Sequence, residues 1–346
     1  MGIHRLPNGI VRVPGVRGCR RALKFGDMLP QATRVMSQMG YGISAVILLA
    51  MTPLSVSAAA EHHSATQPPG YKAARVHYGP MNKMIMSVRI NGQRADLLVD
   101  TGSNQVILDT EAAESCGVRP SQRGPLYIGL TKVQGESLPL GFVQNMSAGS
   151  KSFGSILAAL RKSPHAHTAN ATIDGVLGLD ILFRHKALIN CRTKVVLFKI
   201  DQGRPANFGS VAASEKFTRI PIRREQTGAL TVPCSIRAQS MRLVLDTGAF
   251  ITILHEGFVK SLGLAVEPTR ISAQFGRGAP KRINTAKIGD LSIGMFRVSP
   301  KKLGVTSLPR FALQQGDTRI AGILGMDTLY NCHAIIDLDG MNLFLK

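Results

Sequence analysis

Two stretches of the sequence place an aspartate, a threonine and a glycine directly after an apolar run. LLVDTGSN begins at Leu97 and RLVLDTGAF begins at Arg242, so the two aspartates are Asp100 and Asp246. A carboxylate at the end of a buried strand is unfavourable unless it has a partner. Two carboxyl groups brought together cannot both ionise easily, so they would share one proton over a wide pH range. The two turns therefore predict acid–base chemistry wherever the fold brings them together.

The chain repeats itself at a near-constant offset, which gives a reason for the two turns to meet. The matching pairs are 97–108 with 243–254, 173–183 with 320–330, and 186–199 with 333–346. Three blocks in the same order, 146 or 147 residues apart, indicate a tandem duplication with a polar joint near residues 200–216. Two related halves packed about a twofold axis would place both aspartates at that axis.

Short apolar runs separated by glycine-rich turns predict a mostly-β, barrel-like domain in each copy. The predicted strands are 84–90, 105–108, 230–237 and 251–254, and the predicted helices are 111–118 and 256–264. Asp180 and Asp327 are predicted to cap a short helix near the end of each copy. The insertion 143–172 is less patterned, and FGSILAALRK within it is interpreted as a surface helix.

The first sixty residues have the character of a leader rather than of a domain. A basic segment precedes the uncharged run at 41–60, which ends in small residues, as an export signal does. Twenty uncharged residues are also long enough to span a bilayer, so an uncleaved anchor is the alternative. The chain is therefore predicted to be exported, either periplasmic or secreted, or anchored in the membrane by residues 41–60.

Composition narrows the classes of partner. A chain of 346 residues, 44% of them hydrophobic, can build ordinary aliphatic cores, so disorder is not expected. The net charge of +21 favours an anionic cell-envelope surface over nucleic acid, although solubility explains it equally well. Export permits disulfides among the four cysteines beyond the leader, which lack a zinc-type spacing. His165 and His167 form an HxH without a third ligand, so no metal or cofactor is predicted.

Two such turns, each followed by an apolar-apolar-glycine block, resemble the aspartic proteases, and the compact copies resemble the bacterial retropepsin-like branch. The matching residues are Asp100, Thr101, Gly102 and Ser103, then Asp246, Thr247, Gly248 and Ala249, with Val176, Leu177, Gly178, Ile323, Leu324 and Gly325 in the distal blocks. The resemblance covers about residues 75–346. It implies an all-β fold, mostly β with short helices, in which two closed barrels are related by a pseudo-twofold axis with the active site between them.

The repeat and the resemblance together predict a division of the chain. The predicted segments are a leader at 1–60, a polar linker at 61–75, a first domain at 76–200, a linker at 201–216 and a second domain at 217–346. Because the duplication supplies the symmetry that related enzymes obtain by dimerising, the chain is predicted to be a monomer. By resemblance, two hairpins are expected to cover the substrate, at 125–142 and 271–288.

By resemblance, Asp100 and Asp246 form the catalytic dyad of an endopeptidase. One carboxylate activates a shared water as general base, and its protonated partner donates to the carbonyl oxygen of the scissile peptide bond, without metal or cofactor. Thr101 and Thr247 are expected to interlock beneath the dyad. The expected partner is a peptide or protein substrate. The alternative is a non-catalytic peptide-binding or scaffold protein of the cell envelope, which has no need of two complete turns.

One difference between the turns leads to a hypothesis about the proton. In the family, a hydroxyl at the position after the first glycine bonds the carboxylate. Ser103 supplies this hydroxyl in the first turn, whereas Ala249 does not in the second. Hydrogen bonds favour an ionised carboxylate, so Asp100 is predicted to be the usual base and Asp246 the usual holder of the proton.

Overall fold

The computed structural model describes most of the chain beyond the leader. The described residues are 69–79, 82–121, 130–133, 136–162, 167–168, 171–193, 195–201, 203, 208–273, 279–315 and 318–346. The predicted leader at 1–60 and His165 lie outside these ranges. Among the described residues, no helix has the length and hydropathy needed to cross a membrane.

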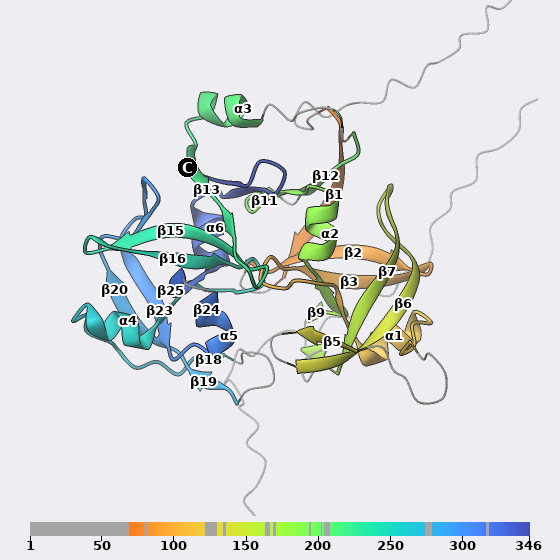
Figure 1. The fold of residues 1–346 in the computed structure, drawn as a ribbon, viewed down its shortest axis with the longest axis horizontal. Coiled ribbons are helices and arrows are strands. Elements are labelled where there is room, and N and C mark those ends of the chain that lie inside the picture. Colours follow the sequence, from red (N-terminus) through yellow and green to blue (C-terminus); the bar gives the residue numbers. More distant parts are fainter. Residues whose placement is uncertain are drawn as a thin grey trace, which may run out of the picture. The chain divides into compact units, whose positions relative to one another are not determined.

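Six strands of the first half close into a barrel (Figure 1). In order around the barrel they are β2 (Met84–Ile90), β3 (Gln93–Val99), β10 (Gly175–Leu177), β4 (Ile107–Asp109), β7 (Lys151–Arg161) and β6 (Glu136–Ala148), and β6 pairs back onto β2. A further strand, β5 (Leu130–Val133), pairs with β6. Two short helices, α1 (Thr110–Ser115) and α2 (Leu179–Arg184), follow β4 and β10.

The second half repeats this order but stays open along its described strands. The path runs β15 (Leu230–Ile236), β16 (Gln239–Leu245), β25 (Thr318–Leu324), β17 (Ile253–His255), β23 (Lys301–Thr306) and β20 (Asn284–Ile288). The free edge of β15 pairs with β14 (Arg223–Arg224) and β21 (Ser292–Ile293), and β21 with β22 (Phe296–Arg297). The helices are α4 (Glu256–Ser261), α5 (Arg310–Leu313) and α6 (Met326–Asn331). The predicted mostly-β fold of two related halves is confirmed, as one closed barrel and one half-barrel.

A six-stranded segment of sheet joins the two halves. Its order is β1 (Tyr71–Tyr78), β12 (Val195–Lys199), β11 (Leu188–Asn190), β26 (Ile335–Asp337), β27 (Asn342–Leu345) and β13 (Thr218–Pro221). At its centre Ile189 pairs with Ile336, which is its own equivalent 147 residues later. An antiparallel pair of equivalent residues places a local twofold axis between them. β1 begins within the predicted linker 61–75, and α3 (Phe208–Ser214) lies within the predicted linker 201–216.

Several expectations about single elements can be compared with the structure. The two predicted helices form as α1 and α4, and Gly117 and Gly263 end them with φ of 69° and 62°. The surface helix expected at FGSILAALRK is wrong, because these residues lie in strand β7. β7 lies between β4 and β6, and its buried residues Phe153, Ile156 and Ala158 contribute to the barrel core. Membership of a closed barrel outweighs the helical pattern of this segment.

The predicted helix caps are also wrong. Gly178 and Gly325 occupy the N-cap positions of α2 and α6, without a side-chain bond. Asp180 and Asp327 lie in the first turn, two residues further on, where a carboxylate can reach outside the helix. Their oxygens accept hydrogen bonds from the N–H groups of Val106, at 3.2 Å, and Thr252, at 2.7 Å. Each aspartate thus fastens the segment that follows an Asp-Thr-Gly turn.

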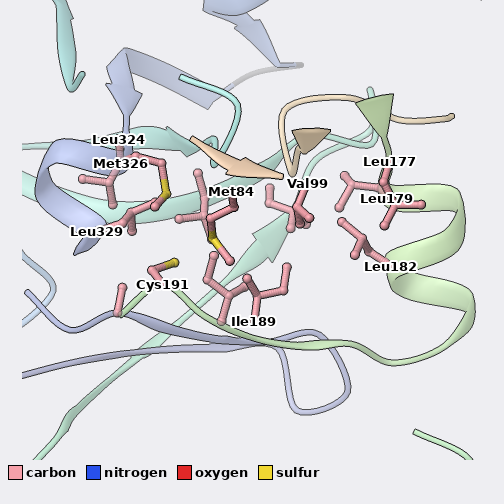
Figure 2. Packing of buried hydrophobic residues seen from close by; sticks show 14 of the residues in the cluster. Met84, Val99, Leu177, Leu179, Leu182, Ile189, Cys191, Leu324, Met326 and Leu329 are labelled. Atoms are coloured by element: carbon pink, nitrogen blue, oxygen red, sulfur yellow. The ribbon is translucent and has the colours of Figure 1, made fainter. Parts of the chain in front are cut away.

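Most of the buried hydrophobic side chains of the two halves belong to one large cluster (Figure 2), and smaller clusters lie beside it. In Figure 2, Met84 lies between side chains of the two halves. They include Leu177, Leu179 and Leu182 from the first half and Leu324, Met326 and Leu329 from the second.

The cysteines Cys116, Cys191, Cys234 and Cys332 are buried free thiols, so no disulfide links them. Burial raises the pKa of Cys191 and Cys234 to about 12.

An ion-pair group links the halves at the joining sheet. Asp339, in the turn between β26 and β27, accepts hydrogen bonds from Lys199 at 2.5 Å and from Lys186 at 2.9 Å. The Lys199 side chain is only 4% exposed. Burial alone raises the pKa of the Asp339 carboxyl, but the bonds from the two lysines outweigh it, and the pKa ends below its usual value.

Replacing Asp339 with Asn is expected to destabilise the fold by about 3 kcal/mol at neutral pH, because it leaves the buried Lys199 without its counter-charge. The measurement is urea unfolding across pH. The difference from wild type should be full above the usual carboxyl pKa and should vanish as the pH falls through the lower folded value. As a control, Glu215→Gln removes the exposed pair with Lys346 (3.7 Å) and should cost less than about 1 kcal/mol. If both substitutions lowered the free energy of unfolding equally, Asp339 would not be stabilising the fold through the buried Lys199.

Candidate active site

Parallel strand pairs bring each aspartate to its position. β3 ends at Val99 beside β10, and the N–H of Asp100 donates to the carbonyl of Leu177 at 3.1 Å. In the second half, Asp246 donates in the same way to Leu324, also at 3.1 Å. The distal apolar-apolar-glycine blocks are therefore the strands against which the two turns are fixed. This accounts for Val176 and Ile323 as well, which lie in the same strand pairs.

The two turns are joined by four hydrogen bonds between threonines and backbone. Thr101 Oγ1 donates to the Leu245 carbonyl at 2.8 Å and accepts from the N–H of Thr247 at 3.0 Å. Thr247 Oγ1 likewise donates to the Val99 carbonyl at 2.7 Å and accepts from the N–H of Thr101 at 3.0 Å. Both threonines are fully buried, so every one of these groups depends on its partner across the axis.

The glycines of the turns allow each carboxyl group to lie against the opposite turn. A Cβ at Gly102 would lie 2.5 Å from the carboxyl carbon of Asp246, and a Cβ at Gly248 would lie 2.5 Å from that of Asp100. No side chain fits at such a distance. Glycine at these two positions therefore lets the two carboxyl groups meet.

The two carboxyl groups are hydrogen-bonded to each other and are not equivalent. Asp100 accepts one backbone N–H, from Gly102 at 2.7 Å. Asp246 accepts two, from Gly248 at 2.8 Å and from Ala249 at 3.0 Å. Burial and the charge of Asp246 raise the pKa of Asp100 well above its usual value. Burial also raises the pKa of Asp246, but the bonds from Asp100 and from the two N–H groups oppose the rise. Because Asp246 accepts one more backbone N–H than Asp100, the hydrogen bonds favour Asp246 as the ionised member and Asp100 as the holder of the shared proton.

The premise of the hypothesis based on Ser103 is wrong, and the hydrogen bonds favour the opposite assignment. The Ser103 hydroxyl is buried and donates to the carbonyl of Gln105 at 2.9 Å, not to the carboxylate. Ala249 has no hydroxyl, yet its backbone N–H supplies the additional hydrogen bond to Asp246. The hypothesis counted side-chain donors, whereas the structure uses a backbone donor that the residue type does not reveal.

The two predicted covering hairpins correspond to strand pairs. The first is β5 with the start of β6, and Thr131 of β5 donates to the side chain of Gln105 at 3.1 Å. The second is β18 (Ser272–Ala273) with β19 (Lys281–Arg282). Residues 122–129, 134–135 and 274–278 lie outside the described part. Among the residues that the structure describes, no cluster of three metal-ligating side chains is present.

Comparison with known proteins identifies the family. The family model described as aspartyl protease matches residues 86–181 and 232–328, which together are more than half of the chain. The chain therefore belongs to the aspartyl protease family, and each matched segment contains one Asp-Thr-Gly turn.

Individual relatives are distant. DNA damage-inducible protein 1 from Neurospora crassa is 26% identical over 152 residues, which are 43% of this chain and 32% of the relative. The match thus spans about a third of the length of that protein. Among solved structures, conglutin gamma from lupine seeds is 11% identical with a TM-score of 0.45, covering 81% of this chain and 95% of the other. An aspartic proteinase from Irpex lacteus is 13% identical with a TM-score of 0.45, covering 80% and 96%.

Replacing Thr101 with Val is expected to lower the free energy of unfolding by about 2–4 kcal/mol. Valine has nearly the same shape, but it leaves the Leu245 carbonyl and the Thr247 N–H buried without a partner. Denaturant unfolding measures the loss. Thr101→Ser keeps the hydroxyl and serves as the control. If the Val and Ser variants were equally stable, the four bonds would not be what joins the turns.

Proposed function

We propose that the chain is an aspartic endopeptidase in which Asp100 and Asp246 are the catalytic dyad. The observation that carries the proposal is the pair of hydrogen-bonded carboxyl groups with raised pKa values, fixed by two symmetric turns. Perturbed carboxyl pairs of this kind are typical of catalytic sites. Both aspartates keep part of their surface exposed, which supports access by a substrate.

The proposed mechanism follows from the inequality of the two carboxyl groups. The carboxylate of Asp246 accepts a proton from a water as the water attacks the carbonyl carbon of the peptide bond. The carboxyl of Asp100 donates its proton to the carbonyl oxygen, which yields a neutral tetrahedral intermediate. Asp246 then gives the proton that it took from the water to the amide nitrogen, and the C–N bond breaks. A hydroxyl of the intermediate returns a proton to Asp100 as the carboxylic acid product forms, so the dyad is restored without a covalent enzyme intermediate.

The proposed setting is the cell envelope. The basic segment and the uncharged run before residue 61 support export, to the periplasm or the exterior, or anchoring by residues 41–60. The proposed partner is a peptide or protein, and the positive net charge supports attraction to anionic envelope surfaces. A monomer is proposed, because one chain supplies both turns.

Asp100→Asn and Asp246→Asn are each expected to lower kcat/KM for peptide cleavage by at least about a hundredfold, because each removes one of the two proton-transfer groups. The measurement is cleavage of a peptide library by the purified full chain from acidic to neutral pH, beside both variants. Loss of cleavage in folded variants would support the dyad. A folded wild type that cuts nothing across this range would instead favour the non-catalytic scaffold.

The pH profile should report the pair rather than Ser103. Activity should fall at acidic pH, where Asp246 takes up a proton, and at higher pH, where Asp100 loses its proton. Because the pKa of Asp100 is raised, the pH range of activity should extend upward. Ser103→Ala should leave the acidic limb unchanged, because the hydroxyl bonds the Gln105 carbonyl. The measurement is kcat/KM as a function of pH for the wild type and the variant. An upward shift of the acidic limb in the variant would instead support Asp100 as the base, with the Ser103 hydroxyl bonded to it.

A further inference from the structure

The loop that follows each Asp-Thr-Gly turn is fastened to a helix in the same way in both halves. In the second half, Met326 donates to the carbonyl of Ala249 at 2.8 Å and Asp327 donates to that of Phe250 at 3.2 Å. The first half has the equivalent backbone bonds from Leu179 to Ser103 and from Asp180 to Asn104. These backbone contacts are symmetric and cannot explain why the two carboxyl groups differ.

The side chains around the two helices are not symmetric. In the first half, Asp180 accepts from the backbone N–H groups of Val106 and Ile181. The residues in the second half that are equivalent to Val106 and Ile181 are two threonines, Thr252 and Thr328. Hydroxyl groups thus replace methyl groups at two buried positions, and each hydroxyl needs a partner there.

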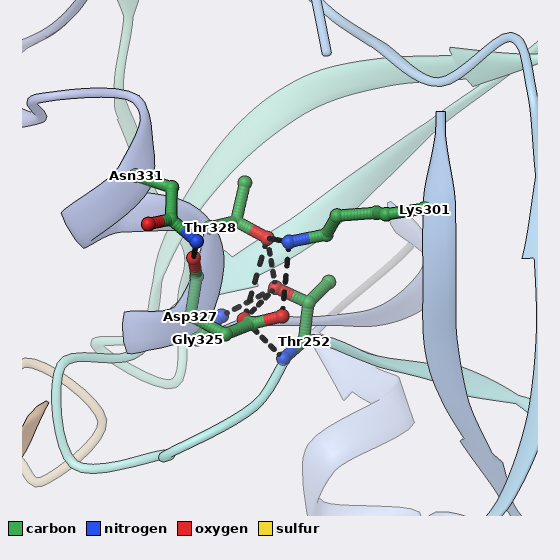
Figure 3. Close-up of polar contacts among 6 residues, drawn as sticks. All are labelled: Thr252, Lys301, Gly325, Asp327, Thr328 and Asn331. Carbon is green, nitrogen blue, oxygen red and sulfur yellow. Dashed lines mark hydrogen bonds and ion pairs between the residues drawn. The ribbon is translucent and has the colours of Figure 1, made fainter. Parts of the chain in front are cut away.

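A lysine completes this network in the second half only (Figure 3). Lys301 of β23 donates to Asp327 Oδ2 at 2.9 Å and to Thr328 Oγ1 at 2.6 Å. The oxygens of Thr328 and Thr252 are 2.6 Å apart, and Thr252 Oγ1 donates to Asp327 Oδ1 at 2.7 Å. Because an ammonium group can only donate, Thr328 is free to donate to Thr252 and Thr252 to Asp327. The four side chains therefore close a ring in which Lys301 donates at both of its contacts and Asp327 accepts at both of its contacts.

The ring acts on the loop that holds the ionised aspartate. Thr252 accepts from the N–H of Gly325 at 3.1 Å and gives its own N–H to Asp327, which ties the end of the loop to the start of α6. The start of the same loop contains Ala249, whose N–H is the additional donor to Asp246. In the first half, the corresponding N–H of Ser103 is directed at the backbone carbonyl of Asp100, at 3.4 Å.

We propose that Lys301 is a positioning residue for Asp246. It closes the ring that keeps the 249–252 loop against α6, so that the N–H of Ala249 remains on the Asp246 carboxylate. The choice of which aspartate is ionised is thus set by a lysine on another strand. The catalytic consequence of this inference rests on the proposed function, whereas its structural part does not.

Two other titratable groups lie near the two halves of the site. Arg161, at the end of β7, belongs to the same half as Asp100 and lowers the pKa of that carboxyl. Cys332, beyond α6, lies near Lys301 and Asp327, and burial raises the pKa of its thiol. Neither group belongs to the ring, so the substitutions below leave both in place.

The test is the titration of the carboxyl pair in Lys301→Met. Methionine keeps the length of the side chain and removes the donor. The lower apparent pKa of the pair is expected to rise by about 0.5–1 unit, the amount that corresponds to one weakened hydrogen bond. Carbon-13 shifts of aspartate-labelled full-length protein measure the pair directly, whether or not peptides are cleaved. In the cleavage assay the acidic limb of kcat/KM should move by the same amount, and Lys301→Arg should restore it.

Lys302→Met is the matched control, because it removes the same charge from the next residue of β23. Lys302 pairs with Glu267 at 2.6 Å in an exposed position outside the ring, so no shift is expected. Thr328→Val breaks the ring without altering its charge and should shift the pair in the same direction, which keeps the test open if Lys301→Met does not fold. An unchanged titration in folded Lys301→Met or Thr328→Val, or an equal shift in Lys302→Met, would overturn the inference. Absence of cleavage with a shifted titration would count against the proposed function only.

Discussion

The meeting of two carboxyl groups at a buried axis is the constraint on which the rest of this structure depends. Burial and the charge of Asp246 raise the cost of charge on Asp100, so the pair retains a proton that an exposed aspartate would lose. Holding them there requires a rigid frame, and the four threonine bonds across the axis supply it. The strands, the glycines and the joining sheet together position the two turns at the axis between the halves.

Duplication within one chain lets the two halves keep the same backbone arrangement while their side chains differ. A pair of identical subunits must present the same residues on both sides of the axis, whereas two halves of one sequence can diverge. Here the backbone frame has remained symmetric, while Val106 and Thr252 differ. The additional N–H on Asp246 and the ring around Lys301 show divergence at the point where a proton must be held by one partner and not the other.

Much of the frame could be predicted because it repeats. A local sequence pattern marks the two turns, the two distal blocks and the helices that end at Gly117 and Gly263. Each pattern occurs in both copies at a near-constant offset, which strengthens the prediction. The segment of β7 was misread because its apolar spacing also fits a helix, and only closure of the barrel decides between the two. Tertiary partners of this kind are absent from any single window of sequence.

The contacts that determine which aspartate holds the proton could not be predicted from the sequence, for a different reason. Asp180 and Asp327 repeat in the sequence, yet a repeated aspartate near a helix start is usually a cap, and their real partners lie more than seventy residues away. The partner of Ser103 is a backbone carbonyl two residues along the chain, and the additional donor to Asp246 is a backbone N–H. The backbone acceptor and the backbone donor are groups that nearly every residue carries, so the sequence contains no sign of which ones are used.

The joining sheet also determines when the two turns can come together. Its central pair joins residues 188–190 to residues 335–337, and β27 (Asn342–Leu345) pairs with the second of these strands. During synthesis the strands of the first barrel are complete long before that strand leaves the ribosome, so the first turn must wait for its counterpart. A nascent chain that ends before Asp246 therefore contains Asp100 without its counterpart. Synthesis of the second half is therefore the step that makes the carboxyl pair possible.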